Sequence, residues 1–238
     1  MNDHQKIIDH LRCELESKDH IYALWVEGSL PQGFADEYSD LDIWISTDDD
    51  KIHTIFDEIK TILSELGEID YEHVSKPRGE LGARTYHIKD MGEHLFIDFN
   101  TQGISRDIYL VRGIDDADVV FDKRGVVKFK NREDYKGDIE AKRAKLRNFY
   151  DQFALRVTKC VRRNQPLEAL YYWHLTLQYV TTFLRRKHGW HDKIEFDLKH
   201  IHRDLPIDVV EELKYFYNVQ TGDLEKELPR LKEWIWGL

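Results

Sequence analysis

The sequence contains no run of eighteen or more apolar residues, so it has no segment that could form a membrane-spanning helix. Its start is polar and charged, which is unlike a secretory signal. Cysteine is scarce: Cys13 and Cys160 form neither a metal-binding nor a redox spacing, and we expect two reduced thiols. We therefore predict a cytoplasmic protein that is not associated with a membrane.

Positive charge is also in short supply, with 35 Lys and Arg against 45 Asp and Glu and a formal net charge of −10. This balance argues against a general nucleic-acid binder, which needs a basic surface. It suits a small cationic partner or a substrate handled with a metal ion. The chain also lacks a Walker loop, an HExxH motif and a nucleophile elbow. These absences argue against P-loop, zincin and α/β-hydrolase chemistry.

The first half of the chain alternates helical and strand patterns. Apolar residues at helical spacing predict helices over residues 3–17 and 50–66, the second ended by Gly67. Short apolar or alternating runs predict six strands: IYALWVEG, LDIWIS, IDYEHV, RTYHIKD, EHLFIDFN and DADVVFDKRG. RTYHIKD and EHLFIDFN, separated by Met91-Gly92, are interpreted as a β-hairpin. Residues 48–50, all aspartate, are interpreted as caps of the second helix.

From about residue 133 the pattern is helical throughout. The stretch LEALYYWHLTLQYVTTFLRR is apolar over most of its surface, which predicts the central helix of a small bundle. Two amphipathic helices are predicted over residues 206–219 and 223–236. We therefore predict an α+β fold, with a small mixed sheet and flanking helices in residues 1–132, followed by a helical bundle in residues 133–238.

Three aspartates lie in predicted strands or at their ends, where this residue type is unfavourable. Asp40 and Asp42 are two residues apart and so point to the same face, where their charges repel. Asp98 lies in LFIDF between apolar neighbours. Asp40 could instead cap a turn after Ser39, but three such acids in one small sheet point to a divalent cation. Two Mg²⁺ ions about 4 Å apart are the arrangement that serves displacement at phosphorus.

A glycine and a serine follow the first predicted strand. Gly28 allows the backbone to approach a ligand closely, and its neighbouring N–H groups can bind a phosphate together with the Ser29 hydroxyl. The sequence therefore places a phosphate-binding turn upstream of the acidic strand.

The ordered set of Gly28-Ser29, Asp40-Leu41-Asp42 and Asp98 resembles the signature of the nucleotidyltransferase superfamily, whose distant members include polymerase β. The phrases GSLPQGFADEYSDLDIWI and VVFDKRG are similar to those of antibiotic nucleotidyltransferases such as aminoglycoside adenylyltransferases, which add a helical domain after the catalytic one. The resemblance covers about residues 20–125 by motif. It implies a nucleotidyltransferase-like catalytic domain over 1–132 and a helical, acceptor-binding domain over 133–238.

The resemblance also implies a role for each matching residue. Gly28 and Ser29 would bind a nucleoside triphosphate, and Asp40 and Asp42 would bind Mg²⁺. Asp98 would be the third acid, as a metal ligand, a general base or both. The implied cofactor is Mg²⁺, with two ions possible in one site, and the implied co-substrate is ATP or another nucleoside triphosphate.

One stretch departs from the pattern of these relatives. Many of them have a small residue and then an arginine before the next glycine, whereas this chain has Pro31 and Gln32 before Gly33. An arginine there would help to neutralise the triphosphate. Its absence leaves more of that charge to the metal and to basic residues elsewhere.

The leading hypothesis is transfer of a nucleoside monophosphate, AMP from ATP, to a hydroxyl of a small molecule, with an aminoglycoside-like antibiotic as one candidate acceptor. From the helical half, Glu168 is the candidate for an acceptor contact or a second base. Two alternatives stay open. One is a catalytically idle, antitoxin-like binding protein, and the other is a glycosyltransferase that uses Asp-x-Asp to hold a metal and a nucleotide sugar.

Overall fold

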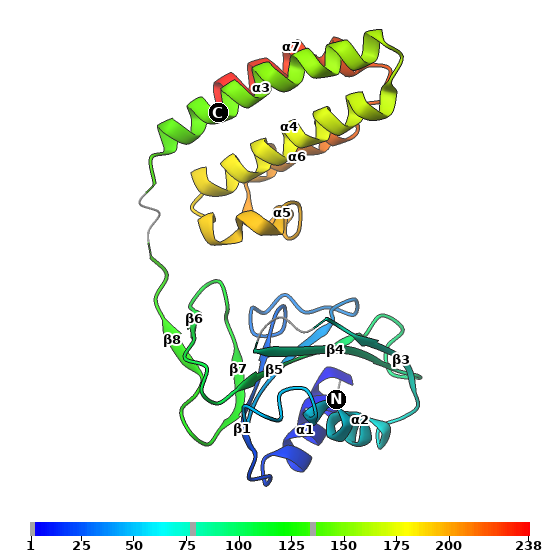
Figure 1. The fold of residues 1–238 in the computed structure, drawn as a ribbon, viewed down its shortest axis with the longest axis vertical. Helices are drawn as coiled ribbons and strands as arrows, with labels where there is room; N and C mark the ends of the chain where they lie inside the picture. Colours follow the sequence, from blue (N-terminus) through cyan, green and yellow to red (C-terminus); the bar gives the residue numbers. More distant parts are fainter. Residues whose placement is uncertain (1–2, 77–79, 134–136) are drawn as a thin grey trace. The chain divides into compact units, whose positions relative to one another are not determined.

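The computed structural model describes residues 3–76, 80–133 and 137–238. The chain divides into two compact units, residues 1–132 and 133–238 (Figure 1). Each unit has a hydrophobic core of its own. The expected fold class is confirmed, with a mixed sheet and helices first and a helical unit second.

The N-terminal unit is built on a six-stranded sheet with the order β3-β4-β5-β2-β1-β7. Its strands are β1 Ile21–Glu27, β2 Leu41–Thr47, β3 Ile69–Val74, β4 Leu81–Ile88, β5 Ile97–Gly103 and β7 Asp118–Asp122. The strands β2 and β5 are parallel, and the other neighbours are antiparallel. All six predicted strands are present, and β4 pairs with β5 as expected. Their connection spans residues 89–96 and is longer than a tight turn at Met91-Gly92.

Two helices cover one face of this sheet, and Figure 1 shows them on the same side. They are α1 Asp3–Leu15 and α2 Ile55–Ser64. Residues such as Ile7 of α1 and Ile59 of α2 are fully buried against Ile43 of β2 and Phe99 of β5. Because side chains alternate along a strand, burying Ile43 and Phe99 on this face turns Asp42 and Asp98 to the other.

The interpretation of residues 48–50 as helix caps is wrong. Helix α2 begins at Ile55, after a series of turns, and its N-cap Thr54 makes no side-chain cap hydrogen bond. Asp48 instead accepts a hydrogen bond from the Tyr22 hydroxyl at 2.6 Å. Asp49 accepts one from the backbone N–H of Ser105 at 3.1 Å. These acids fasten neighbouring segments to the turns before the helix, which local sequence patterns do not reveal.

The second face of the sheet carries a smaller apolar cluster at its β1 side. Trp25 and Trp44 stack with ring centroids 5.7 Å apart. Trp25 packs with Leu110 of a two-stranded parallel ribbon, β6 Tyr109–Val111 and β8 Lys128–Lys130. Each of these strands is three residues long, too short for alternation to predict. The ribbon covers part of the second face.

The C-terminal unit is a helical bundle, as predicted. Its elements are α3 Ile139–Arg162, α4 Pro166–Lys187, the 3₁₀ helix η1 His191–Phe196, α5 Ile201–Asp204, α6 Ile207–Tyr217 and α7 Leu224–Gly237. Pro166 stands at the first turn of α4, where its missing N–H costs nothing. The core centres on α4, with Trp173 and Leu177 fully buried. In the described part of the chain, no helix is both long and apolar enough to cross a membrane.

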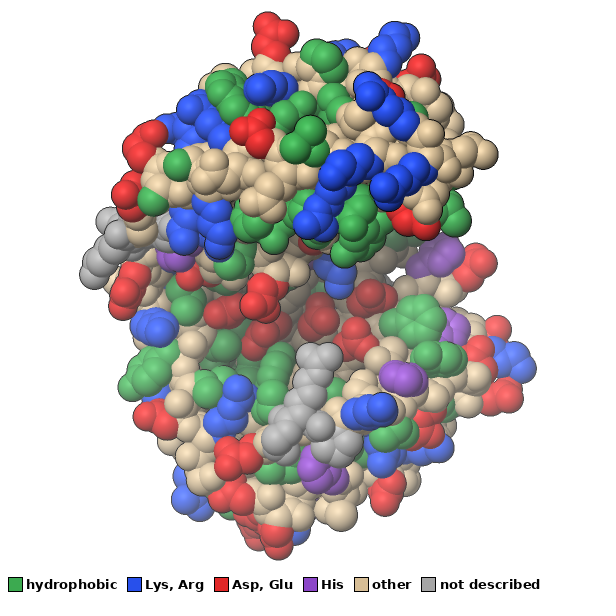
Figure 2. Space-filling view, turned by 45° about the horizontal axis from the view of Figure 1, so that its top comes forward, with side chains coloured by type: hydrophobic (Ala, Val, Ile, Leu, Met, Phe, Trp, Pro, Cys, Tyr) green, Lys and Arg blue, Asp and Glu red, His purple; other side chains and the backbone are tan. Residues whose placement is uncertain are grey.

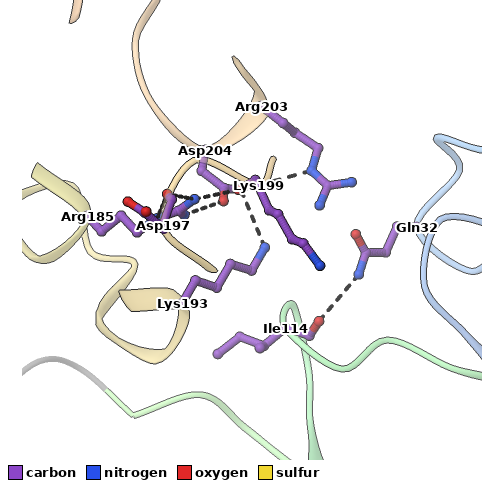
Figure 3. Close-up of polar contacts among 8 residues, drawn as sticks. All are labelled: Gln32, Ile114, Arg185, Lys193, Asp197, Lys199, Arg203 and Asp204. Atoms are coloured by element: carbon purple, nitrogen blue, oxygen red, sulfur yellow. Dashed lines mark hydrogen bonds and ion pairs between the residues drawn. The ribbon is translucent and has the colours of Figure 1, made fainter. Parts of the chain in front are cut away.

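A buried ion cluster holds the segment between α4 and α6 (Figure 3). The Arg185 side chain is inaccessible to solvent, and its Nη1 lies 2.6 Å from Asp204 Oδ2. It also donates to the backbone carbonyl oxygens of Asp197 and Lys199. The Lys193 ammonium lies 3.4 Å from the other Asp204 oxygen. Satisfying the donors of a buried guanidinium in this way fixes residues 191–204 against α4.

Candidate functional site

Asp42 and Asp98 lie side by side on the two central strands of the sheet, β2 and β5. They are register partners across the parallel pair β2 and β5, so their side chains project from the same face. This face is opposite to the one covered by α1 and α2, and both residues are half-buried. The Thr85 hydroxyl, from the register partner of Asp98 on β4, donates a hydrogen bond to Asp98 Oδ1.

Asp40 lies just before β2, with its side chain exposed. Its Oδ1 accepts a hydrogen bond from the backbone N–H of Phe96 at 3.3 Å. Loss of hydration raises the pKa of the Asp40 carboxyl group, the Phe96 N–H opposes that rise, and the nearby negative charge of Asp98 adds to it. The structure therefore brings all three predicted acids to one end of β2 and β5, with Asp40 partly committed to a backbone contact.

The carboxylate oxygens of this site can be compared with the ligands that a bound Mg²⁺ ion requires. Among the residues that the structure describes, no group of three or more His, Cys, Asp or Glu side chains is arranged to hold a metal ion. Mg²⁺ commonly takes only one or two protein carboxylates and completes its shell with water and substrate phosphates. The neighbouring carboxylates of Asp42 and Asp98 fit that lighter requirement.

Gly28 lies directly beside this acid pair. Its φ of +79° is one that side-chain-bearing residues rarely adopt, and a Cβ built on it would lie 2.0 Å from Asp42 Oδ2. Glycine is therefore required both by the backbone conformation and by the close approach of the carboxylate. The adjoining turn is closed by hydrogen bonds from Phe34 N–H to the Ser29 carbonyl and from Gly33 N–H to the Leu30 carbonyl, both 3.0 Å.

Gln32 stands at the position where the family resemblance led us to expect an arginine. Its Nε2 donates to the carbonyl oxygen of Ile114 at 3.3 Å (Figure 3). The side chain thus ties the turn after β1 to the loop between β6 and β7. In this chain, residue 32 therefore links two loops of the N-terminal unit by a hydrogen bond.

A fourth carboxylate, Glu27, belongs to the same row and was missed by the sequence prediction. It is the register partner of Asp42 on the β1 side, and its Oε1 accepts a hydrogen bond from the Trp25 indole at 2.7 Å. Burial raises the pKa of Glu27 to about 7, and the charges of Asp115 and Asp42 contribute. The available signal was a glutamate at the end of an apolar strand. Its relation to Asp42 depends on the pairing register.

A cavity of about 430 Å³ adjoins the acid pair on the side of β5 and β4. Its walls include Asp42 and Trp44 of β2, Asp98 and Asn100 of β5, and Thr85 of β4. The remaining lining residues are Ser75, Lys76, Leu81, Ala83, Arg84 and Phe99. In Figure 2, acidic side chains gather on the N-terminal unit in the lower half of the view. The acids thus lie beside a cavity of ligand size.

Glu168 lies in the first turn of α4, in the C-terminal unit, with its side chain exposed. An acid at this place complements the positive end of the helix dipole, which is sufficient to explain it. A contact between Glu168 and an acceptor stays a prediction.

Comparison with known proteins gives a limited result. No protein-family model matches the chain, and no curated protein matches it. Among solved structures, a nucleotidyltransferase-like protein from Exiguobacterium sibiricum 255-15 aligns with 10% identity and a TM-score of 0.33, covering 98% of this chain and 74% of that one. The protein JHP933 from Helicobacter pylori aligns with 11% identity and a TM-score of 0.30, covering 99% and 96%.

Proposed function

We propose that this protein is a metal-dependent nucleotidyltransferase that transfers a nucleoside monophosphate, AMP from ATP, to a hydroxyl of a small molecule. The observation that carries the proposal is the juxtaposition of Asp42 and Asp98, in register on one sheet face, with the close-packed Gly28 turn. Carboxylates for Mg²⁺ and a glycine turn for phosphates are the parts that phosphoryl transfer requires. An aminoglycoside-like antibiotic is one candidate acceptor.

Each part has a role in this proposal. Asp42 and Asp98 would hold Mg²⁺, with Asp40 beside them, and the ion would neutralise negative charge on the triphosphate when bound. The backbone of Gly28-Ser29 would orient the outer phosphates. A bond forms between the acceptor oxygen and the α-phosphorus, while the bond from that phosphorus to the bridging oxygen breaks. The electron pair leaves with pyrophosphate, and the hydroxyl proton passes to water. Catalysis then comes chiefly from positioning and charge neutralisation.

A catalytically idle binding protein is the second candidate. Two observations favour it: Gln32 is engaged with Ile114, and the described residues include no metal-binding group of three or more side chains. An idle protein should show no metal-dependent binding of nucleotide.

Isothermal titration with ATP, with and without Mg²⁺, separates the two candidates. We expect Mg²⁺-dependent binding by the parent protein and its loss in Asp42→Asn. Asp118→Asn is the matched control, because it removes the same charge from an exposed residue of the edge strand β7. Nucleotide binding that is absent, or equal without Mg²⁺, contradicts the proposal.

A pyrophosphate-release screen of ATP, GTP, CTP and UTP against aminoglycosides, lincosamides and other hydroxylated compounds then identifies the acceptor.

A further inference from the structure

Thr85 lies next to Asp98 on the acidic face of the sheet. The two residues are register partners across the antiparallel pair β4 and β5, and both are half-buried. The Thr85 hydroxyl group donates a hydrogen bond to Asp98 Oδ1. A hydroxyl group has one proton to donate, so this bond commits it. Asp42 lies on the other side of Asp98, which therefore stands between a hydrogen-bond donor and a second carboxylate.

The basic residues near Thr85 do not pair with Asp98. Arg84 places its guanidinium group on the other face of the sheet, where its Cζ lies 4.9 Å from the centre of the Phe56 ring. Lys76 lines the cavity beside Asp98. Within the described residues, neither of these cations forms an ion pair with Asp98, and Asp98 Oδ2 accepts no hydrogen bond. Thr85 therefore occupies one oxygen of this carboxylate and leaves the other available to an ion.

The number of available oxygens bears on which divalent cation the site can hold. Ca²⁺ takes about six to eight oxygen ligands and accepts both oxygens of one carboxylate, whereas Mg²⁺ requires a small, near-ideal octahedron. The two oxygens of a carboxylate are closer together than neighbouring corners of that octahedron, so Mg²⁺ takes only one of them. A carboxylate with one oxygen already held by a hydroxyl group therefore suits Mg²⁺ better than Ca²⁺.

We propose that Thr85 is a positioning residue that makes the site select Mg²⁺ over Ca²⁺, an inference that rests on the proposed function. By holding Asp98 Oδ1, Thr85 restricts Asp98 to binding an ion through Oδ2. The branched side chain of threonine has restricted χ1 freedom, which keeps the hydroxyl group in place. Asp40 shows the same pattern, since its Oδ1 accepts a hydrogen bond from the backbone N–H of Phe96. The sheet thus supplies the hydrogen bonds that limit both acids to one oxygen.

The test measures nucleotide binding by the full-length protein with Mg²⁺ and with Ca²⁺. The nucleotide is α,β-methylene-ATP, which cannot transfer AMP, and calorimetry gives its dissociation constant with each ion. Thr85→Val keeps the shape of the side chain without the hydroxyl group, Thr85→Ala removes that group together with the methyl group, and Thr85→Ser retains it. Thr101→Val is the matched control, because Thr101 lies on the same strand as Asp98 but on the opposite face. There its hydroxyl group donates to the Ile52 carbonyl oxygen at 2.6 Å.

We expect the parent, Thr85→Ser and Thr101→Val to bind the nucleotide more tightly with Mg²⁺ than with Ca²⁺. This preference is the ratio of the two dissociation constants. In Thr85→Val and Thr85→Ala it should fall roughly tenfold, the scale of one hydrogen bond to a charged group.

The inference is overturned by a parent without a preference for Mg²⁺, or by an unchanged ratio in both Thr85→Val and Thr85→Ala. It is also overturned if the ratio falls equally in Thr85→Ser or Thr101→Val. If the affinities with both ions fall in proportion, Thr85 supports the fold of the sheet and does not select the ion. A parent that binds no nucleotide with Mg²⁺ overturns the proposed function itself.

Discussion

Gly28 is subject to two constraints that can be separated by mutation. Gly28→Ala must strain a backbone with φ of +79° and also displace the Asp42 carboxylate. Gly113→Ala is a natural control, since its φ is +81° and its added Cβ would meet nothing within 4 Å. The strained backbone alone should cost roughly 1–2 kcal/mol. We expect Gly28→Ala to lower the free energy of unfolding clearly more than Gly113→Ala in urea titrations. Equal losses would show that the contact with Asp42 is unimportant.

We expect Asp42 to lower the stability of the metal-free protein and to be required for the binding of Mg²⁺-ATP. In the metal-free protein its charge lies beside Asp98 and Glu27, so Asp42→Asn should leave the melting temperature equal or raise it. The same variant should lose most of the stabilisation by Mg²⁺-ATP, which for the parent amounts to about 2.7 kcal/mol at a hundred times the dissociation constant. Thermal melts with and without Mg²⁺-ATP measure both effects. A less stable variant with an undiminished ligand shift would mean that Asp42 is purely structural.

Glu27 should make the metal-free protein sensitive to pH. Its pKa is raised from 4.5 to about 7, so the folded state holds the proton more tightly than the unfolded state does. The stability that this proton contributes is full below about pH 4.5 and is lost as the pH rises to about 7. Relative to Glu27→Gln, the parent should therefore lose on the order of 3 kcal/mol across this window. Urea unfolding of both proteins at several pH values, with a chelator present, tests this. Parallel pH profiles would contradict it.

For single residues, the sequence predicts which face of the sheet a side chain projects from better than it predicts which other residues lie beside it. Alternation along LDIWIS and LFIDF is enough to place Asp42 and Asp98 on the face away from the main core, because the aliphatic residues Leu41, Ile43 and Ile45, and likewise Ile97 and Phe99, fall on the opposite face. It does not place Glu27 opposite Asp42, since that depends on how two strands pair across a thirteen-residue connection from 28 to 40. It also does not reveal that Gln32 donates to Ile114, 82 residues further along.

At the scale of elements, the long helix α3 owes part of its stability to its cap. Asp138 accepts hydrogen bonds from the backbone N–H groups of Glu140 and Ala141 at 2.9 and 3.0 Å. Asp138→Ala should therefore lower the free energy of unfolding by about 1 kcal/mol. Gln165→Ala is the control, because Gln165 precedes α4 but makes no side-chain cap hydrogen bond. Chemical denaturation gives the free energy of unfolding of both variants. Equal losses would show that the Asp138 cap does not stabilise the protein.

The elements that the sequence predicts well are those with several repeats of a pattern. Helices α3 and α4 repeat their apolar stripe over many turns, and the strands of the main sheet alternate over five to eight residues. The ribbon strands β6 and β8 and the short helices η1 and α5 offer too few positions for a period to emerge. They are fixed by tertiary contacts instead, as the hydrogen bonds of Arg185 to the segment before α5 illustrate.

At the scale of the whole molecule, the two units have separate hydrophobic cores and separate proposed tasks. A fragment of residues 1–132 contains the complete sheet, the acids and the cavity. We expect it to fold and to bind Mg²⁺-ATP with nearly the affinity of the full chain. If the helical unit binds the acceptor, as the sequence resemblance implies, the fragment should lose acceptor-dependent pyrophosphate release. Calorimetry and a pyrophosphate assay measure the two properties, and full transfer activity in the fragment would contradict this division.

The stacked pair Trp25 and Trp44 gives this molecule an optical property. Two indole rings 5.7 Å apart and nearly parallel are close enough for their excited states to couple. Such coupling gives a paired positive and negative band in circular dichroism when the two transition moments are rotated relative to each other within the ring planes. The other four tryptophans lie in the C-terminal unit, and none of them stacks on another tryptophan among the described residues. The exciton signal therefore originates on one sheet of one unit. Since Trp44 also lines the cavity beside the acids, the band would respond to a ligand that enters there, without any label on protein or ligand.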